Sequence, residues 1–275
     1  MGTRKFAVVG CKKIRRRLFS LRINPNSCQR QTLLSPKYCV KRARIPVTIH
    51  LLFDIDGTLL LSGGAGWTAM QIAFQQVFEQ REVDHVPVRG RTDRGIVAEM
   101  FCNQGVDDNV QNRQRFFDVY LSRLPKTLAK SNGSLLPGVS SLLNELSDDP
   151  DICLGLLTGN IEPAAWTKLK HFEIDCHFSF GGFGGDDKNR NQVAEKALAA
   201  GKAHSSTILE NHRTIVIGDT VRDIQCARSI DCRCIGVLTG GSSRQEMSEA
   251  DPDLLLDDLS DPTQFIDGIA TICEA

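Results

Sequence analysis

The sequence of 275 residues has no apolar run near the roughly 18 residues that a membrane-spanning helix needs, so no integral membrane protein is expected. It has no Cys-x-x-Cys pair, and the most closely spaced of its ten cysteines are Cys232 and Cys234. Because no secretory signal is visible, reduced and mostly buried thiols are favoured over a disulfide framework. Internal repeats and low-complexity tracts are absent. With 41% hydrophobic and 24% charged residues, the composition is that of a globular protein and excludes wholesale disorder, collagen and coiled coil.

Acidic residues are absent from residues 1–46, which carry 13 lysines and arginines. The rest of the chain holds 20 basic against 33 acidic residues, so the net charge of zero hides a sharp asymmetry. Such a leader resembles an organelle transit peptide or a nucleic-acid-binding arm, but a disordered tail or upstream sequence from a misplaced start codon is the plainer interpretation. We favour the plainer one and expect a cytoplasmic protein, with organelle targeting as the alternative. Nucleic acid is disfavoured because Phe6, Phe19 and Tyr38 stand isolated.

Strand and helix patterns alternate through most of the chain from residue 47 onward. Val47–Phe53 is a β-rich run, apolar enough for burial on both faces. Later strands are expected at Ile152–Leu157, His177–Phe180, Thr214–Ile217, Cys234–Leu238 and Leu254–Leu256. The glycine-rich run Gly181–Gly185 is interpreted as a loop. The alternation predicts an α/β protein with a Rossmann-like, mostly parallel sheet that helices cover on both faces.

A different pattern between residues 62 and 133 predicts an all-helical insert. Apolar side chains recur there at helical spacing around residues 67–78, 96–101 and 116–124. The predicted organisation is therefore a basic leader (1–46), an α/β core (47–61 and 134–275) and a helical cap (62–133).

Two aspartates follow the first predicted strand. Because residues i and i+2 of a strand point the same way, Asp54 and Asp56 project together from its carboxyl end, where open α/β sheets bind ligands. Gly57 allows a sharp turn, and Thr58 can place its hydroxyl near a bound anion. One carboxylate can bind a divalent metal and attack phosphorus, while the other donates a proton to the leaving oxygen. The D-x-D-G-T pattern therefore predicts a catalytic site.

The segment Phe53–Leu59 resembles the first signature of the haloacid dehalogenase superfamily. Leu156–Asn160 ends an apolar strand with a hydroxyl and a glycine, like the second signature. Ile217–Asp223 ends another strand with two acids four apart, like the fourth. The resemblance covers essentially all of 47–275, and the helical insert lies where the phosphoglycolate phosphatase and β-phosphoglucomutase branch carries its cap. It therefore implies a fold of that superfamily and membership of that branch.

Carried over residue by residue, the resemblance implies a Mg²⁺-dependent phosphatase. Asp54 is the nucleophile that forms an aspartyl-phosphate, and Asp56 protonates the leaving group and then deprotonates water. Asp219 joins Asp54 and the Asp56 carbonyl on Mg²⁺, and Asp223 supports this set or adds an outer ligand. The phosphate is expected to be bound by Thr158, Gly159 and Asn160, together with Gly57 and Thr58. Dehalogenases and phosphonatases lack the second acid, so Asp56 indicates phosphate ester or anhydride chemistry.

The basic residue of the third signature has two candidates. The family usually has a lysine just before a helix, and counting back from the helix that contains Val193 favours Lys188. The Asp187-x-x-Arg190 spacing instead resembles an arginine-using variant. One of the two is expected to pair with Asp54 and the phosphate, because two anions cannot approach each other without a cation.

Arg89, Arg91 and Arg94 lie where related caps place a substrate-specificity loop. Several cations around one small pocket suit a second substrate anion, such as a carboxylate. We therefore expect esters of the phosphoglycolate kind to be preferred over neutral sugar phosphates, with Arg91, next to Gly90, as the first choice for the contact. A solvated helix start is the alternative for these arginines.

The predicted substrate is thus a small phosphorylated metabolite. A β-phosphoglucomutase-like phosphomutase and a nucleotidase or pyrophosphatase remain alternatives. A nucleic-acid-binding protein with a vestigial enzyme core is a different class, against which the intact acids argue. No membrane partner is expected, and both a monomer and a homodimer are compatible with the sequence.

Overall fold

The computed structural model of the chain describes residues 48–79, 83–205 and 211–274. These residues belong to the unit Arg44–Ala275, one of two units into which the chain divides. The basic leader, residues 1–46, lies outside the described residues, so the expectations about it stay predictions.

Six parallel strands form the central sheet in the order β5-β4-β1-β6-β7-β8. Their bounds are β1 (Ile49–Phe53), β4 (Ile152–Thr158), β5 (Phe180–Phe183), β6 (Thr214–Gly218), β7 (Arg233–Val237) and β8 (Leu254–Leu256). Leu51 of β1 lies opposite Leu154 on one side and Ile215 on the other. From β1 the chain builds first one side of the sheet and then the other, so the strand order reverses beside β1. Sheets of this kind bind ligands in the crevice at such a reversal.

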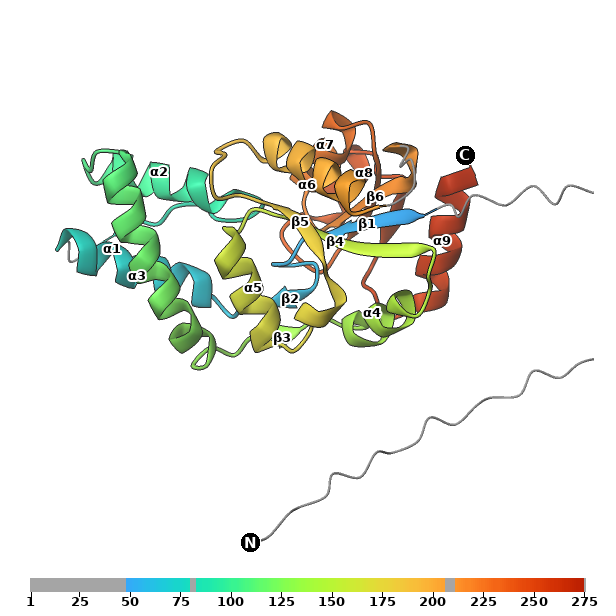
Figure 1. Ribbon diagram of the computed structural model, residues 1–275, viewed down its shortest axis with the longest axis horizontal. Coiled ribbons are helices and arrows are strands. Elements are labelled where there is room, and N and C mark those ends of the chain that lie inside the picture. Colours follow the sequence, from blue (N-terminus) through green and yellow to red (C-terminus); the bar gives the residue numbers. More distant parts are fainter. Residues whose placement is uncertain (1–47, 80–82, 206–210, 275) are drawn as a thin grey trace, which may run out of the picture. The chain divides into compact units, whose positions relative to one another are not determined.

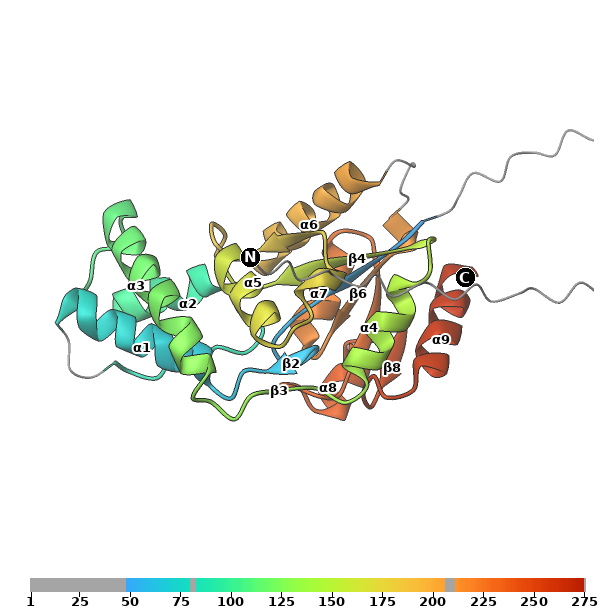
Figure 2. The same cartoon turned by 60° about the horizontal axis from the view of Figure 1, so that its bottom comes forward.

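Successive side chains of β1 point to opposite faces of the sheet, so each face has its own apolar core. Leu51 and Phe53 pack on the face covered by α4 (Val139–Ser147), α5 (Glu162–His171) and α9 (Pro262–Glu274). Leu52 packs on the other face, under α6 (Arg190–His204), α7 (Val221–Ser229) and α8 (Arg244–Glu249). Figure 2 shows α4 and α9 on one side of the sheet and α6 on the other. The predicted α/β class with helices on both faces is confirmed.

Three helices, α1 (Ala65–Phe78), α2 (Asp93–Asn103) and α3 (Val110–Leu128), form a separate apolar core. Its centre is a set of edge-to-face aromatic contacts in which the ring of Phe74 lies 6.0 Å from Phe101 and 6.4 Å from Phe116. The short strands β2 (Leu60–Leu61) and β3 (Ser134–Leu135) pair where the chain enters and leaves these helices (Figure 1). Among the described helices, none combines the length and the apolar character needed to cross a membrane.

The strand β5 corrects two predictions. Residues 177–180 were expected to be a strand, but a 3₁₀ turn, η1 (Asp175–His177), precedes β5, which begins at Phe180. The glycine-rich run interpreted as a loop supplies most of this edge strand. A Cβ on Gly182 would overlap the carbonyl oxygen of Val193, so a glycine is what lets α6 lie this close to the sheet. A second 3₁₀ turn, η2 (Asn211–Arg213), precedes β6.

Burial of the thiols is only partial. Of the described cysteines, Cys226, Cys232 and Cys234 are buried, whereas Cys102 and Cys176 are exposed. The expectation of mostly buried thiols therefore holds near β7 but not for the seven described cysteines taken together.

Candidate active site

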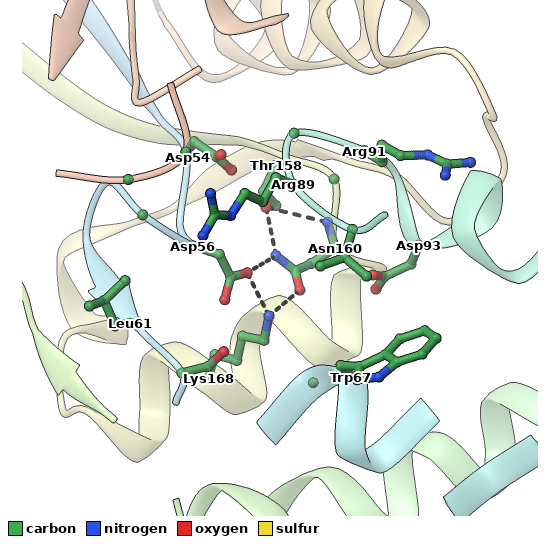
Figure 3. A pocket seen from close by; sticks show the side chains of 18 of the residues that line it. Asp54, Asp56, Leu61, Trp67, Arg89, Arg91, Asp93, Thr158, Asn160 and Lys168 are labelled. Carbon is green, nitrogen blue, oxygen red and sulfur yellow. Dashed lines mark hydrogen bonds and ion pairs between the residues drawn. The ribbon is translucent and has the colours of Figure 1, made fainter. Parts of the chain in front are cut away.

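The carboxyl ends of β1, β4 and β6 bring the predicted site residues together. Asp54 follows β1, Thr158 ends β4, and Asp219 follows β6. All three line one cavity of about 590 Å³, whose other wall comes from the cap and includes Trp67 and Arg89 (Figure 3). The parallel sheet explains this meeting, because the ends of adjacent parallel strands share one edge.

Three buried carboxylates meet at this edge. Ligand oxygens of Asp54, Asp219 and Asp223 all lie within 4.8 Å of one another. Burial raises the pKa of Asp54 against the opposing charge of Arg190. Burial and the charges of Asp223 and Asp54 raise the pKa of Asp219. Among the described residues Arg190 is the cation ion-paired within this group, so one cation serves three carboxyl groups. A dense set of hard oxygen donors with so little positive charge beside it fits Mg²⁺.

Asp219 is held by the turn that follows β1. Thr58 Oγ1 donates to Asp219 Oδ1 at 3.1 Å, and the Gly241 amide donates to Oδ2 at 2.7 Å. Gly57 has φ of 92°, and a Cβ there would lie 2.5 Å from Asp219 Oδ2. Gly57 and Thr58, predicted to contact phosphate, are therefore placed by the structure against the carboxylate of Asp219.

Asp223 has both carboxylate oxygens occupied by protein donors. Its Oδ2 accepts from the amide of Thr220 at 3.0 Å and from the hydroxyl of Thr220 at 2.7 Å, in the capping box that begins α7. Its Oδ1 accepts from Arg190 at 2.6 Å. This arrangement suits the supporting role implied by the resemblance better than direct coordination of a metal.

Of the two candidate cations, Arg190 is the one that reaches the carboxylates. Its Nη2 lies 2.9 Å from Asp54 Oδ2, and its side chain is buried. Burial opposes the charged form of Arg190, but the charges of Asp223 and Asp54 outweigh this and raise its pKa. Lys188 instead has a side chain that is 58% exposed and pairs with Asp108 of the cap at 3.0 Å. The structure therefore does not bring Lys188 to Asp54.

Asp56 belongs to a separate hydrogen-bonded group (Figure 3). Asn160 Nδ2 donates to Asp56 Oδ2 at 2.9 Å and to Thr158 Oγ1 at 2.8 Å. Lys168 Nζ donates to the same Asp56 oxygen at 2.5 Å and to Asn160 Oδ1 at 2.7 Å. Burial alone would raise the pKa of Asp56, but the Lys168 charge and these hydrogen bonds lower it. Thr158 uses its oxygen as an acceptor, so its own O–H can donate to a phosphate oxygen.

Lys168 is not among the site residues predicted from the sequence, although a signal for it exists. On α5 its side chain lies on the buried face, together with Ala164, Ala165 and Leu169. A lysine on an apolar helix face is costly unless an anion accompanies it, so its position pointed to a buried acid.

The cap loop brings both Arg89 and Arg91 to the lining of the cavity, but their side chains run in different directions. Arg91 pairs with Glu99 at 2.6 Å, and it donates to the carbonyl oxygens of Pro87 and Gly95. Figure 3 shows Arg91 extending away from the site, whereas Arg89 projects over it. Arg91 as the substrate contact stays a prediction, and Arg89, for which no ion pair with a described residue is found, is the alternative that the geometry favours. Sequence alone could not separate the two, since the Glu99 partner reaches Arg91 only once the loop has folded onto α2.

The start of α2 docks directly on the loops of the site. The Asp93 amide donates to the Gly159 carbonyl at 2.7 Å, and Asp93 Oδ2 accepts from the Ile161 amide at 2.8 Å. Burial raises the pKa of Asp93 to about 6. Gly159, predicted to contact phosphate, is therefore also a point where the cap meets the core.

Residues 51–237 match the family of haloacid dehalogenase-like hydrolases. The phosphoglycolate phosphatase of Salmonella choleraesuis (strain SC-B67) is 22% identical over 227 residues, which cover 76% of this chain and 88% of the relative. The phosphoglycolate phosphatase of Synechococcus elongatus is 25% identical over 223 residues, covering 78% and 96%. Among solved structures, CbbY from Rhodobacter sphaeroides in complex with phosphate has the same fold, with a TM-score of 0.62 at 19% identity over 79% of this chain and 97% of that one.

The chain therefore belongs to the haloacid dehalogenase-like hydrolases, as its signatures predicted. It is an enzyme of that family, and the phosphatases among its relatives support phosphatase activity.

Proposed function

We propose that this hydrolase is a Mg²⁺-dependent phosphatase that passes the phosphoryl group of a small acidic ester through Asp54 to water. The observation that carries the proposal is that the two aspartates after β1 lie in different environments, which suit different roles. Asp54 lies among Arg190 and the buried acids, whereas Asp56 lies in the group formed with Asn160 and Lys168. Both side chains line the same cavity, so one phosphate can meet a nucleophile and a proton donor together.

The reaction has two balanced steps. An Asp54 oxygen forms a bond to phosphorus as the bond from phosphorus to the leaving oxygen breaks, and Asp56, in the protonated form that water restores in the second step, gives that oxygen a proton. Water then gives a proton to Asp56, forms a bond to phosphorus and displaces Asp54, which returns as a carboxylate while inorganic phosphate leaves. Phosphoryl transfer depends mainly on positioning the phosphate and on neutralising the negative charge of its equatorial oxygens. Arg190 and the Thr158 hydroxyl are suited to both.

The metal would be held by Asp54, Asp219 and the Asp56 carbonyl. Bound there, Mg²⁺ supplies positive charge to the phosphate oxygens. The feature of this chain that supports such a site is the cluster of three carboxyl groups around a single ion-paired cation.

The cap side of the cavity favours a second anion over a sugar. Arg89 projects over the cavity, while Leu61, Trp67 and Met70 give much of the remaining cap-side wall an apolar surface. A neutral sugar would lose water from several hydroxyls there with few groups to replace it, whereas a carboxylate can pair with the guanidinium. The names of the curated relatives agree with a phosphoglycolate-like substrate.

Phosphate release from 2-phosphoglycolate tests the proposal. We expect turnover with Mg²⁺, a loss of at least about 100-fold with EDTA, and a loss of several orders of magnitude in Asp54→Asn, which keeps its shape but lacks the attacking charge. Asp148 is exposed at the end of α4, so Asp148→Asn is the matched control and should behave as wild type. If folded Asp54→Asn keeps a tenth of wild-type activity, Asp54 is not the nucleophile.

A further inference from the structure

Lys168 is a buried cation that donates hydrogen bonds to the acid–base aspartate, Asp56, and to Asn160. Only 5% of its side chain is exposed, and its Nζ lies 2.5 Å from Asp56 Oδ2. Its second partner, Asn160 Oδ1 at 2.7 Å, itself donates to that same Asp56 oxygen through Nδ2 at 2.9 Å. A buried ammonium is tolerated only with such partners, so these three side chains form one interdependent group.

The backbone around Lys168 makes this group rigid. The helix α5 begins at Glu162, four residues after the end of β4 at Thr158, so the lysine is joined to the phosphate-facing loop through a short stretch of backbone. The cap covers the ammonium from the other side: a Cβ on Gly66, in the first turn of α1, would lie 3.6 Å from Lys168 Nζ. The lysine is thereby fixed between the core and the cap.

The contacts are unequal between the two oxygens of Asp56. Both Lys168 and Asn160 donate to Oδ2, and neither donates to Oδ1. These two donors, together with a hydrogen bond to Ser62, limit the rotation of the Asp56 carboxylate, so its oxygens have defined directions. A general acid must come within about 2.6–3.2 Å of the atom it protonates, so those directions decide how well it works.

We propose that Lys168 is a positioning residue that acts through Asp56, aligning its carboxyl group with the leaving oxygen of the substrate. The inference rests on the proposed function and deepens it, because it requires Asp56 to be the proton donor. The alternative role is direct binding of the substrate, because Lys168 also lines the cavity. Direct binding would affect every substrate equally, whereas positioning of Asp56 matters only for a leaving group that needs a proton.

The test compares two leaving groups. A primary alkoxide such as that of 2-phosphoglycolate needs a proton as it leaves, whereas p-nitrophenolate is stable without one. In Lys168→Met, which keeps the length of the side chain without its charge, we expect kcat/KM to fall about 100-fold for 2-phosphoglycolate and less than about 5-fold for p-nitrophenyl phosphate. Lys170→Met, at an exposed position two residues along α5, should leave both values unchanged.

A double variant separates action through Asp56 from other roles. Asp56→Asn should show the same leaving-group dependence, and Asp56→Asn/Lys168→Met should be no slower than Asp56→Asn alone. Equal losses for both substrates in a folded Lys168→Met protein, or additive losses in the double variant, would overturn the inference in favour of substrate binding or a structural role.

Lys168→Arg provides the measurement if Lys168→Met does not fold, as judged by circular dichroism. Arginine keeps the charge but places its nitrogens differently, so the alkyl ester should again lose more kcat/KM than the aryl ester, and equal losses would contradict the inference. Failure of the proposed function looks different, because wild type and the Asp54→Asn variant would then be equally inactive on both substrates.

Discussion

Arg190 Nη2 lies between two carboxylates, 2.9 Å from Asp54 Oδ2 and 2.6 Å from Asp223 Oδ1. The first residue of α6 thus connects the end of β1 to the start of α7. In the proposed mechanism this bridge lets Asp54 approach a phosphate although acids surround it, since the guanidinium offers several donors in a fixed plane.

The bridge predicts different roles for the two candidate cations. In Arg190→Lys a single ammonium cannot reproduce the planar set of donors of the guanidinium. We therefore expect kcat/KM for p-nitrophenyl phosphate to fall at least about 30-fold, equivalent to about 2 kcal/mol. Lys188→Ala removes a half-exposed ion pair with Asp108 and should change activity less than about 2-fold. Equal losses in both variants would place the phosphate-binding cation elsewhere.

The cap arginines are expected to differ in the same way. Arg89→Ala should lower kcat/KM for 2-phosphoglycolate at least about 10-fold more than for p-nitrophenyl phosphate, because only the first substrate has a carboxylate to pair with Arg89. Arg91→Ala breaks the pair with Glu99 and should affect the two substrates equally. A wild-type preference for neutral sugar phosphates would contradict the role of Arg89.

Metal binding should be measurable without any substrate. Saturating Mg²⁺ binds the folded state and should raise the melting temperature by about 3–8 °C, as expected for about 1.5–3 kcal/mol in a domain of this size. Asp219→Asn should abolish this rise, yet in EDTA it should be at least as stable as wild type, because it relieves repulsion among Asp54, Asp219 and Asp223. Calcium-free buffers and Asp148→Asn serve as controls. A Mg²⁺ shift that survives in Asp219→Asn would place the metal elsewhere.

Acid should destabilise the protein through His50. This side chain of β1 is fully buried, neither ring nitrogen has a hydrogen-bond partner among the described residues, and burial together with the charge of His204 lowers its pKa from 6.5 to about 4. Between pH 6.5 and about 4, His50 is protonated in the unfolded chain but stays neutral in the folded protein. The stability that is present above pH 6.5 is therefore lost as the pH falls to about 4.

The expected loss from His50 is about 2–3 kcal/mol of the free energy of unfolding. Urea unfolding at pH 7 and at pH 4.5 measures it, and His50→Leu should show a smaller difference between the two conditions. His171→Leu, at the exposed end of α5, is the control and should keep the wild-type difference. An unchanged pH dependence in His50→Leu would contradict the prediction.

The sequence was enough to predict the placement of residues that depends on local spacing along the chain. Asp54 and Asp56 share a direction because a strand has a period of two, and Asp219 joins them because parallel strands end at one edge. The apolar strands alternating with helices were enough for the α/β class, and the signatures were enough for the family. The strand at Phe180–Phe183 was misplaced because glycines, which usually mark a turn, here make room for α6.

The sequence by itself therefore determined the class of fold, the family and the acids at the strand ends. Only the tertiary structure decided which cation serves each acid. Arg190 and Lys188 are two residues apart, as are Arg89 and Arg91, and in each pair an acid of the cap binds one member, Asp108 for Lys188 and Glu99 for Arg91. Lys168 meets Asp56 across 112 positions of sequence. The helix pattern can place a lysine on a buried face, but which acid it meets depends on how the elements pack in space.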